Sequence, residues 1–209
     1  MLKMKQYPSI PTKHKGKCTA FWVFDKIDGS NIRVEWTKKR GFSKFGTRKR
    51  LLGSDQGILA RAEGIANAQE KVFRSVFELH KIEKVICFFE FWGPNSFAGN
   101  HLASDTHKLT LIDVDVYRQG MVAPSKFLEM FDASPIDIPD FLHYGPIDEE
   151  FRQSVRKSEL PGVTHEGVVC KAYNKRKRNV EMFKIKSESW IAAVKAQYAD
   201  KPELLEQIL

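Results

Sequence analysis

A lysine with two aspartates and an asparagine close to it is the part of this sequence best suited to chemistry. Lys26 lies between Asp25 and Asp28, and Asn31 follows in the same short segment. A deprotonated amine can attack a phosphorus atom or a carbonyl carbon, but an unperturbed lysine, with a pKa of about 10.4, is almost entirely protonated at neutral pH. A reactive Lys26 therefore needs burial, other cations or a metal ion to disfavour its ammonium form. The alternative is a surface cation with Asp25 and Asp28 as neighbours.

Two expected β-strands flank this segment and would hold it in place. Residues 20–24 are apolar and aromatic, whereas apolar and polar side chains alternate over residues 32–37. The second pattern has the period of a half-buried strand. Gly29, between the two strands, permits a tight turn or a close approach of the backbone to a ligand. We therefore expect the segment to lie at the mouth of a cleft, with its polar side chains pointing inward.

Charged residues on two further expected strands are candidates for the same cleft. Glu90 ends an otherwise apolar strand at 84–91, where a carboxylate is costly without a polar partner. Lys184 and Lys186 project from one face of a strand at 181–186, because side chains alternate along a strand. Two adjacent ammonium groups repel each other unless an anion lies between them. The alternative is a solvent-facing edge strand, where lysine discourages aggregation.

The rest of the chain is expected to form further helices and strands of the same fold. A basic stretch at 47–53 either holds a phosphate, which the planar fork of arginine suits, or is a solvated loop. A long amphipathic helix at 55–81 is expected to be scaffold, with Phe73 and Phe77 in the core. The other expected elements are, in chain order, an irregular arm at 1–17, a return strand at 42–48, a strand at 109–116, short helices at 125–131 and 148–157, a strand at 165–171, a basic turn at 174–178 and a helical segment at 188–209 broken near Pro202.

Composition and charge narrow the classes of protein to be considered. The chain has 209 residues, 42% of them hydrophobic, which is enough for one domain with a core. A net charge of +8 suggests a polyanionic partner, although a basic surface can also be merely solvated. No apolar run approaches the ~18 residues needed to cross a membrane, and no secretory signal begins the sequence. The three cysteines lie apart and offer no zinc spacing, so we expect an intracellular, cytoplasmic protein.

Six segments, in a fixed order, resemble the motifs of the covalent nucleotidyltransferases, the superfamily of ATP-dependent RNA and DNA ligases and mRNA capping enzymes. They lie at 26–29, 47–50, 88–93, 109–116, 166–171 and 184–186. One such match is weak, but the ordered set covers most of the chain. Within the superfamily, Asn31 favours RNA ligases of the nick-sealing and RNA-editing type, because capping enzymes and many DNA ligases have arginine there.

The resemblance implies a fold and a domain organisation. The fold class is α+β: a nucleotidyltransferase (ATP-grasp-like ligase) domain with antiparallel sheets flanking an ATP cleft. Residues 1–187 would form this adenylation domain and residues 188–209 a short helical tail. The tail is too short for the OB-fold domain that DNA ligases and capping enzymes usually carry. A partner protein or domain would then supply the missing clamp on the nucleic-acid strand.

The resemblance also implies a reaction in three steps with ATP and Mg²⁺ or Mn²⁺ as cofactors. Lys26 attacks the α-phosphate of ATP and keeps AMP, the AMP moves to a 5′-phosphate, and a 3′-hydroxyl displaces it to join RNA ends, possibly in a nicked duplex. Glu166 would hold the metal ion and Glu90 a ribose hydroxyl. Lys184 and Lys186 would neutralise the phosphates and depress the pKa of Lys26 before ATP binds. The remaining residues assigned to nucleotide binding are Asp25, Ile27, Asn31 and Arg48, with Asp28, Arg50, Asp113, Ile112 and Lys171 as further members of the motifs.

One further feature of the sequence departs from the superfamily pattern, and the resemblance leaves alternative functions open. The strand at 109–116 lacks the aromatic ring that usually stacks on adenine, so Ile112 or an aromatic from elsewhere would cover the base. The alternatives to an RNA ligase are a minimal ATP-dependent DNA ligase, a capping-type enzyme that uses GTP, and a non-catalytic module that binds RNA ends. The last needs no amine at Lys26.

Overall fold

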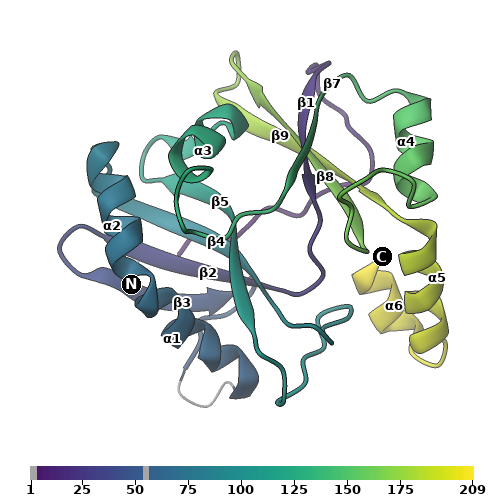
Figure 1. Ribbon diagram of the computed structural model, residues 1–209, viewed down its shortest axis with the longest axis horizontal. Coiled ribbons are helices and arrows are strands. Elements are labelled where there is room, and N and C mark those ends of the chain that lie inside the picture. The colour runs from purple at the N-terminus through teal and green to yellow at the C-terminus, as the bar shows by residue number, and fades with distance from the viewer. Residues whose placement is uncertain (1–3, 54–56) are drawn as a thin grey trace.

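Two antiparallel β-sheets form the framework of the protein. We describe a computed structural model that places residues 4–53 and 57–209 (Figure 1). Within these residues one sheet has five strands, in the order β3-β2-β4-β5-β6, and the other has four, in the order β7-β1-β8-β9. β1 (Phe21–Asp25) and β2 (Ser30–Thr37) are consecutive in the chain but belong to different sheets. The segment that contains Lys26 is therefore the crossing from one sheet to the other.

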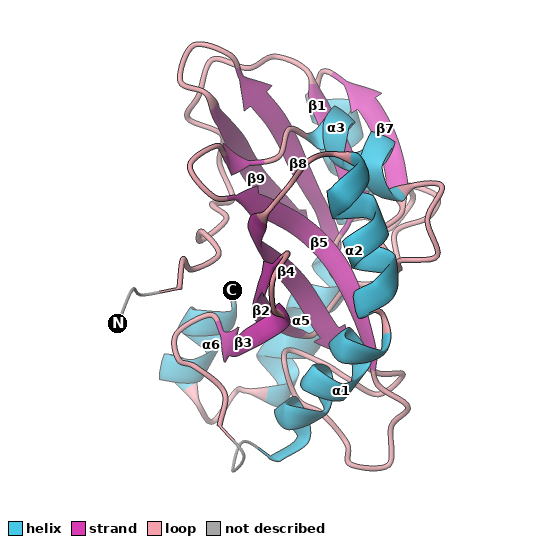
Figure 2. Cartoon of the chain, turned by 90° about the vertical axis from the view of Figure 1, so that its left-hand side faces the viewer, coloured by secondary structure: helices cyan, strands magenta, loops and turns pink. Residues whose placement is uncertain are grey.

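The five-stranded sheet carries the larger hydrophobic core. Its other strands are β3 (Gly41–Thr47), β4 (Lys84–Trp92), β5 (Lys108–Val116) and β6 (Gly120–Met121). α1 (Arg61–Ala68), α2 (Glu70–Leu79) and α3 (Pro124–Phe131) bury their apolar sides against it, and Figure 2 shows α1 and α2 alongside these strands. Phe73 and Phe77 are fully buried there, as predicted, and pack against Phe89 and Phe131. This packing leaves the opposite face of the sheet free to form a site.

The four-stranded sheet has its own smaller core. It contains β7 (Phe141–Gly145), β8 (Gly167–Asn174) and β9 (Asn179–Lys186) in addition to β1. α4 (Glu149–Arg156) covers one face, where Val155 meets Phe21, Val23 and other apolar residues. The alternation of side chains along β1, β8 and β9 places Phe24, Val169 and Lys184 together on the opposite face, because these residues are paired in register.

The N-terminal arm is irregular, as predicted, but it is fastened to both sheets. Arg33 of β2 donates hydrogen bonds to the carbonyls of Met4 and Lys5, and the Lys184 amide of β9 donates to the Pro11 carbonyl. Tyr7 is buried and donates its hydroxyl hydrogen to Asp113 of β5. The arm therefore closes one side of the space between the sheets.

The C-terminal segment forms two helices, as the sequence predicts. α5 (Glu188–Gln197) begins at Ser187, whose hydroxyl accepts a hydrogen bond from the Trp190 amide. α6 (Pro202–Ile208) follows after a break at the predicted proline. Across the part of the chain that the structure places, no helix is long and apolar enough to cross a membrane.

The α+β fold is as predicted, but one element is wrong and two are unforeseen. The sequence predicts one helix at 55–81, but the structure has three elements there. The 3₁₀ turn η1 (Gly57–Ala60) leads into α1, and a break at Gln69 separates α1 from α2. Residues 55 and 56 lie outside the described part of the chain. Gly64 and Asn67 are weak helix formers close to that break. β6 and β7 were not foreseen because both are short strands.

Candidate active site

A cavity of about 700 Å³ lies between the sheets, and most of the residues singled out from the sequence surround it. Its walls come from the β1–β2 crossing, the end of β3, β4, β5, β8, β9 and the N-terminal arm. All the sequence-predicted site residues except Asp113 line it: Lys26, Asp25, Ile27, Asn31, Arg48, Glu90, Lys184, Lys186, Glu166, Asp28, Arg50, Ile112 and Lys171. Segments far apart in the chain thus meet at one site, while the role of each residue stays a prediction.

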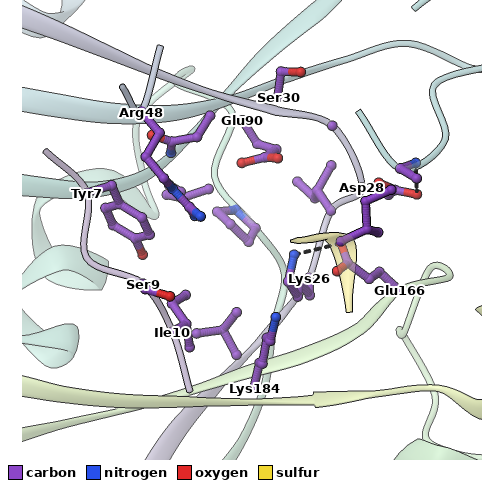
Figure 3. Close-up of a pocket in the computed structure, with 18 of the residues that line it drawn as sticks. Tyr7, Ser9, Ile10, Lys26, Asp28, Ser30, Arg48, Glu90, Glu166 and Lys184 are labelled. Carbon is purple, nitrogen blue, oxygen red and sulfur yellow. Dashed lines mark hydrogen bonds and ion pairs between the residues drawn. The ribbon is translucent and has the colours of Figure 1, made fainter. Parts of the chain in front are cut away.

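Glu166 lies at the centre of the site, between two ammonium groups. Its Oε2 is 2.6 Å from Nζ of Lys26, and its Oε1 is 3.2 Å from Nζ of Lys186 (Figure 3). The backbone supports this arrangement, because the Lys26 amide donates to the Gly167 carbonyl at 2.9 Å. The Lys26 side chain thus points into the cavity while its nitrogen is held by a buried carboxylate.

The expectation that the pKa of Lys26 is depressed was wrong for the unliganded protein. Burial lowers this pKa, but the carboxylates of Glu166, Glu90 and Asp28 outweigh burial and raise it above the usual value. Two neighbouring lysines have a lowered pKa: that of Lys184 falls to about 8, because of burial first and the charges of Lys186 and Lys26 second, and that of Lys186 is lowered chiefly by burial. Figure 3 shows Lys184 pointing toward Lys26, and both belong to the same sheet's side of the cavity, Lys184 in β9 and Lys26 directly after β1. In this state Lys26 is an ammonium ion.

Glu90 and Asn31 lie side by side on paired strands, and each presents a polar group to the cavity. Burial, with the nearby charge of Glu166, raises the pKa of Glu90 to about 8, although Lys26 and Arg48 act in the other direction. Nδ2 of Asn31 donates to the Phe89 carbonyl at 3.3 Å. Oδ1 of Asn31 is buried and has no partner among the described residues. The free Oδ1 of Asn31 can accept a hydrogen bond from a hydroxyl group. A phosphate offers acceptors instead of donors, so a hydroxyl suits this atom better than the phosphate that we expected Asn31 to hold.

The two aspartates next to Lys26 serve as local supports. Asp25 accepts hydrogen bonds from the backbone amide and the hydroxyl of Thr164, at 2.9 and 2.8 Å. Asp28 accepts from the Ala98 amide at 2.8 Å and from the indole of Trp190 at 2.7 Å. Both carboxylates are therefore used in holding the crossing between β1 and β2 in place.

Two glycines allow the backbones to approach closely around Glu166 and Lys26. Gly167 has a φ of +130°, and a Cβ atom there would lie 2.1 Å from the Ile185 carbonyl oxygen. A Cβ atom at Gly29 would lie 2.4 Å from the carbonyl oxygen of Phe91. Neither separation is possible for a real side chain, so the site requires glycine at both positions.

Lys171 and Asp113 form a buried ion pair that joins the two sheets behind the cavity. Nζ of Lys171 is 2.8 Å from Oδ2 of Asp113 and 2.7 Å from the Ile112 carbonyl oxygen. Tyr7 donates to the same aspartate oxygen, so the N-terminal arm is part of this junction. Asp113 thus lies behind the cavity wall and holds Lys171, which lines the cavity.

An apolar slot lies beside this junction. Ile112 of β5 and Val169 of β8 line the cavity from different sheets, and Phe24 lines it next to Val169. Two apolar walls of this kind suit a flat heterocyclic base. Ile112 was predicted as a cover for the base, whereas Val169 was missed; its place three residues after Glu166 in an alternating strand was the available signal.

The cationic end of the cavity is contributed by β9 and by the segment after β3. Arg48, Lys49 and Arg50 are exposed at its mouth, and Figure 3 shows Arg48 reaching inward. At the other wall, Nζ of Lys186 is 2.8 Å from the Ile208 carbonyl oxygen and Nζ of Lys184 is 3.4 Å from that of Leu209. The end of α6 and the residue after it therefore supply backbone oxygen acceptors to two lysines that could bind phosphates.

This site could hold a divalent ion only if a bound ligand supplied some of the atoms that coordinate the ion. No three His, Cys, Asp or Glu side chains within residues 4–53 and 57–209 are arranged to hold a metal ion. Mg²⁺, however, keeps several water molecules and is commonly held by one or two carboxylates together with substrate phosphates. The single carboxylate of Glu166, at the cavity wall, fits an ion that binds with a nucleotide.

Several other site residues were not predicted from the sequence. Tyr7, Ser9 and Ile10 line the cavity from an arm that carries no regular pattern, so no sequence signal identified them. Trp190 lines it from α5, and its only signal was a large aromatic residue soon after Lys186. These residues come into the site through contacts between distant segments.

Comparisons with known proteins show which family the chain matches. The model of the RNA ligase family matches residues 19–186. Among solved structures, the RNA ligase of Naegleria gruberi with PPi has a TM-score of 0.65 and 15% identity over 95% of this chain and 59% of that chain. A mutant of that ligase with AMP and Mn has a TM-score of 0.63 and 12% identity, over 91% of this chain and 58% of the other. Another mutant, with ATP and Mn, has a TM-score of 0.60 and 15% identity, over 84% and 52%.

These similarities differ in what they establish. At 12–15% identity the solved structures show a common fold. This chain spans less than 60% of the length of each of those proteins. No curated protein matches the chain in sequence.

Proposed function

The chain belongs to the RNA ligase family, and from this premise we propose that it is an ATP-dependent RNA ligase that joins a 5′-phosphate to a 3′-hydroxyl through a lysyl-AMP intermediate. The observation that carries the proposal is the position of Lys26: its amine points into a cavity of nucleotide size that Lys184 also lines, and it lies beside Glu166. ATP and Mg²⁺ or Mn²⁺ are the proposed cofactors. A relative's structures contain ATP, AMP and Mn, which supports this choice.

In the proposed first step, Nζ of Lys26 attacks the α-phosphorus of ATP. A phosphorus–nitrogen bond forms, the bond to the bridging oxygen breaks, and pyrophosphate leaves with the electron pair. Lys26 must first lose a proton, which the carboxylates now oppose. A divalent ion bound at Glu166 would supply positive charge to the phosphates and counter the charge that holds the ammonium. The proton then passes to solvent through the open cavity.

Lys184, Lys186 and Arg48 are placed to stabilise the phosphates during this step. Negative charge develops on the leaving pyrophosphate, and cations held in advance where this charge develops stabilise it. The backbone oxygens of Ile208 and Leu209, which contact these two lysines in the unliganded protein, would give way to phosphate oxygens. Lys184, with its pKa at about 8, becomes fully charged when an anion binds beside it.

The later steps use the same groups. An oxygen of the RNA 5′-phosphate attacks the phosphorus of AMP, the bond to Lys26 breaks, and the amine takes up a proton. A 3′-hydroxyl then attacks the activated 5′-phosphorus, loses its proton and releases AMP. The free Oδ1 of Asn31 could accept a hydrogen bond from a ribose hydroxyl, and the carboxyl group of Glu90, with its raised pKa, could make a second such contact. Residues 1–187 would form the adenylating unit, and another segment or partner protein would clamp the strand.

The proposal is tested by incubation of the protein with radiolabelled ATP or GTP and Mg²⁺, followed by a denaturing gel. We expect an AMP adduct from ATP that is stable to alkali and labile to acid, as a phosphorus–nitrogen bond is, that is absent in Lys26→Ala, and that is chased to RNA carrying a 5′-phosphate. Lys26→Arg is expected to fail as well, since a guanidinium stays protonated. Labelling by GTP alone would indicate a capping-type enzyme. Undiminished labelling of the Lys26 variants would overturn the assignment.

A further inference from the structure

A tryptophan in the C-terminal segment contacts two charged groups of the proposed catalytic site. Trp190 is the third residue of α5 and is 1% exposed, yet it lines the cavity. Its Nε1 donates a hydrogen bond to Oδ2 of Asp28 at 2.7 Å. Asp28 lies two residues after Lys26 in the crossing between the sheets. The indole hydrogen bond therefore holds the segment that carries the nucleophile.

The face of the same ring lies against the ammonium of Lys186. Nζ of Lys186 is 4.0 Å from the ring centroid, within the range of a favourable cation–π contact. Glu166, at 3.2 Å, and the Ile208 carbonyl, at 2.8 Å, contact this nitrogen as well. When phosphates replace the carbonyl, the ring remains a fixed neighbour of Lys186. The Trp190 side chain thus contacts both the segment that follows β1, through Asp28, and the last residue of β9, Lys186.

The start of α5 fixes the position of this ring relative to β9. Ser187 directly follows Lys186, its backbone amide donates to the Glu166 carbonyl at 3.0 Å, and its hydroxyl caps the helix through the Trp190 amide. The chain between Lys186 and Trp190 is therefore short, and the hydrogen bonds of Ser187 hold it in place. The other buried members of the same cluster, Val194 and Tyr198, do not line the cavity. Burial alone does not explain the two polar contacts of Trp190.

We propose that Trp190 is a positioning residue, which holds the Lys186 ammonium and the Lys26–Asp28 segment in the arrangement needed for attack on the nucleotide phosphate. This inference rests on the proposed function. Misplaced charges stabilise a transition state less than aligned ones, so loss of the ring acts on the rate of adenylation. The start of α5 then belongs to the catalytic unit, which extends beyond residue 187.

The test compares variants that remove one or both contacts. Trp190→Phe keeps a ring face for Lys186 but donates nothing to Asp28, whereas Trp190→Leu removes both interactions. Val194→Ala, from the same buried cluster, is the control for lost packing. The measurement is the single-turnover rate of lysyl-AMP formation against ATP concentration, below the melting temperature of every variant. We expect the maximal rate to fall by roughly 10-fold or more in Trp190→Leu and by about 3- to 10-fold in Trp190→Phe.

The half-saturating ATP concentration is expected to change less than about 3-fold in these variants, since the lost alignment matters chiefly in the transition state. Val194→Ala is expected to melt earlier and to keep its maximal rate within about 2-fold. Adding Asp28→Ala to Trp190→Phe is expected to cost less than Asp28→Ala costs alone, because the hydrogen bond between the indole and Asp28 is already gone. These results would support the positioning role.

Three results would overturn it. Equal maximal rates in Trp190→Phe and the wild type, with additive effects in the double variant, would make Trp190 a core residue only. A parallel loss of rate in Val194→Ala would assign the effect to packing. If the wild type itself forms no adduct with ATP, the proposed function fails and the role of Trp190 fails with it, a result distinct from the first two. If Trp190→Leu does not fold, the Phe variant and the double variant still decide.

Discussion

Nζ of Lys26 lies 2.6 Å from Oε2 of Glu166, a residue 140 positions later in the chain. This ion pair joins the proposed nucleophile to the proposed metal ligand, so the unliganded protein holds its own nucleophile in the protonated form. A ligand that engages Glu166 would release the amine. The pair thus couples reactivity of Lys26 to occupancy of the cavity.

Glu166→Gln is expected to change two properties of Lys26 in opposite directions. Adenylation with ATP and Mg²⁺ should fall by about 100-fold or more, because the carboxylate that binds the ion is lost. Without metal or nucleotide, acetylation of Lys26 near pH 8 should become faster, because removing the carboxylate lowers the pKa of the amine. Mass spectrometry of the labelled peptide measures the second effect. If both properties were unchanged, Glu166 would be a structural acid only.

Glu90→Gln is expected to stabilise the protein, by an amount that grows with pH. The pKa of Glu90 is raised to about 8 in the folded protein, whereas an unfolded glutamate titrates near 4.3. Between these values the unfolded chain releases a proton that the folded chain keeps, so the stability of the wild type relative to the glutamine variant declines as pH rises. Because Glu90 is only partly buried at the cavity wall, we expect a difference of about 1–3 kcal/mol at pH 8.

Urea unfolding of the wild type and Glu90→Gln at pH 5, 6, 7 and 8 measures this difference. The gap should be small at pH 5 and should level off above pH 8, where both states of the wild type are ionised. A gap that is the same at every pH would mean that the Glu90 carboxyl ionises normally in the folded protein.

Gly167→Ala is expected to destabilise the fold and abolish adenylation. The new methyl group would lie 2.1 Å from the Ile185 carbonyl oxygen, and the φ of +130° is strained for any residue but glycine. We expect a loss of about 3 kcal/mol or more, seen as a large fall in Tm. Gly64→Ala is the matched control, because it has open space in α1 and should gain up to about 1 kcal/mol. A normal Tm for Gly167→Ala would contradict the close approach of β8 and β9.

Strand joining is expected to require a 5′-phosphate, to prefer a ribose at the 3′ end, and to weaken steeply with salt. Lys49 and Arg50 are exposed at the mouth of the cavity and would contact RNA phosphates, releasing counterions. Lys49→Ala should lower RNA affinity for all sequences and reduce the slope of log K against log salt by about 1. Nicked and single-stranded substrates with ribose or deoxyribose ends test the sugar preference. Equal sealing of both sugars would favour a DNA ligase.

The sequence predicted the components of the site better than their interactions. The order of the motifs and the alternation of Lys184 and Lys186 placed the lysines correctly on one face of β9, because strand geometry is local. The direction of the Lys26 pKa shift was wrong, because it depends on which charges are nearest in space. Glu166 is the direct contact of Lys26, whereas Lys184 only points toward it from β9 of the same sheet.

The misses in the fold have the same cause. Tyr7 reaches Asp113 across 106 positions, and nothing in the irregular arm indicates that contact. The break at Gln69 separates two helices that both pack into the same core, α1 through Ala62 and Ala66 and α2 through Phe73 and Phe77. A helical period alone does not reveal where such a break occurs.

The order of the strands has a consequence for the way in which this protein folds during synthesis. β2 to β6 are consecutive in the chain and can pair once residue 121 has left the ribosome. β1 precedes them, but its partners in the other sheet begin only at Phe141 and Gly167, so its pairing must close a long loop. A nascent chain that ends before Glu166 therefore carries Lys26 without Glu166, Lys184 or Lys186, and the proposed adenylation has to wait until these residues have been made.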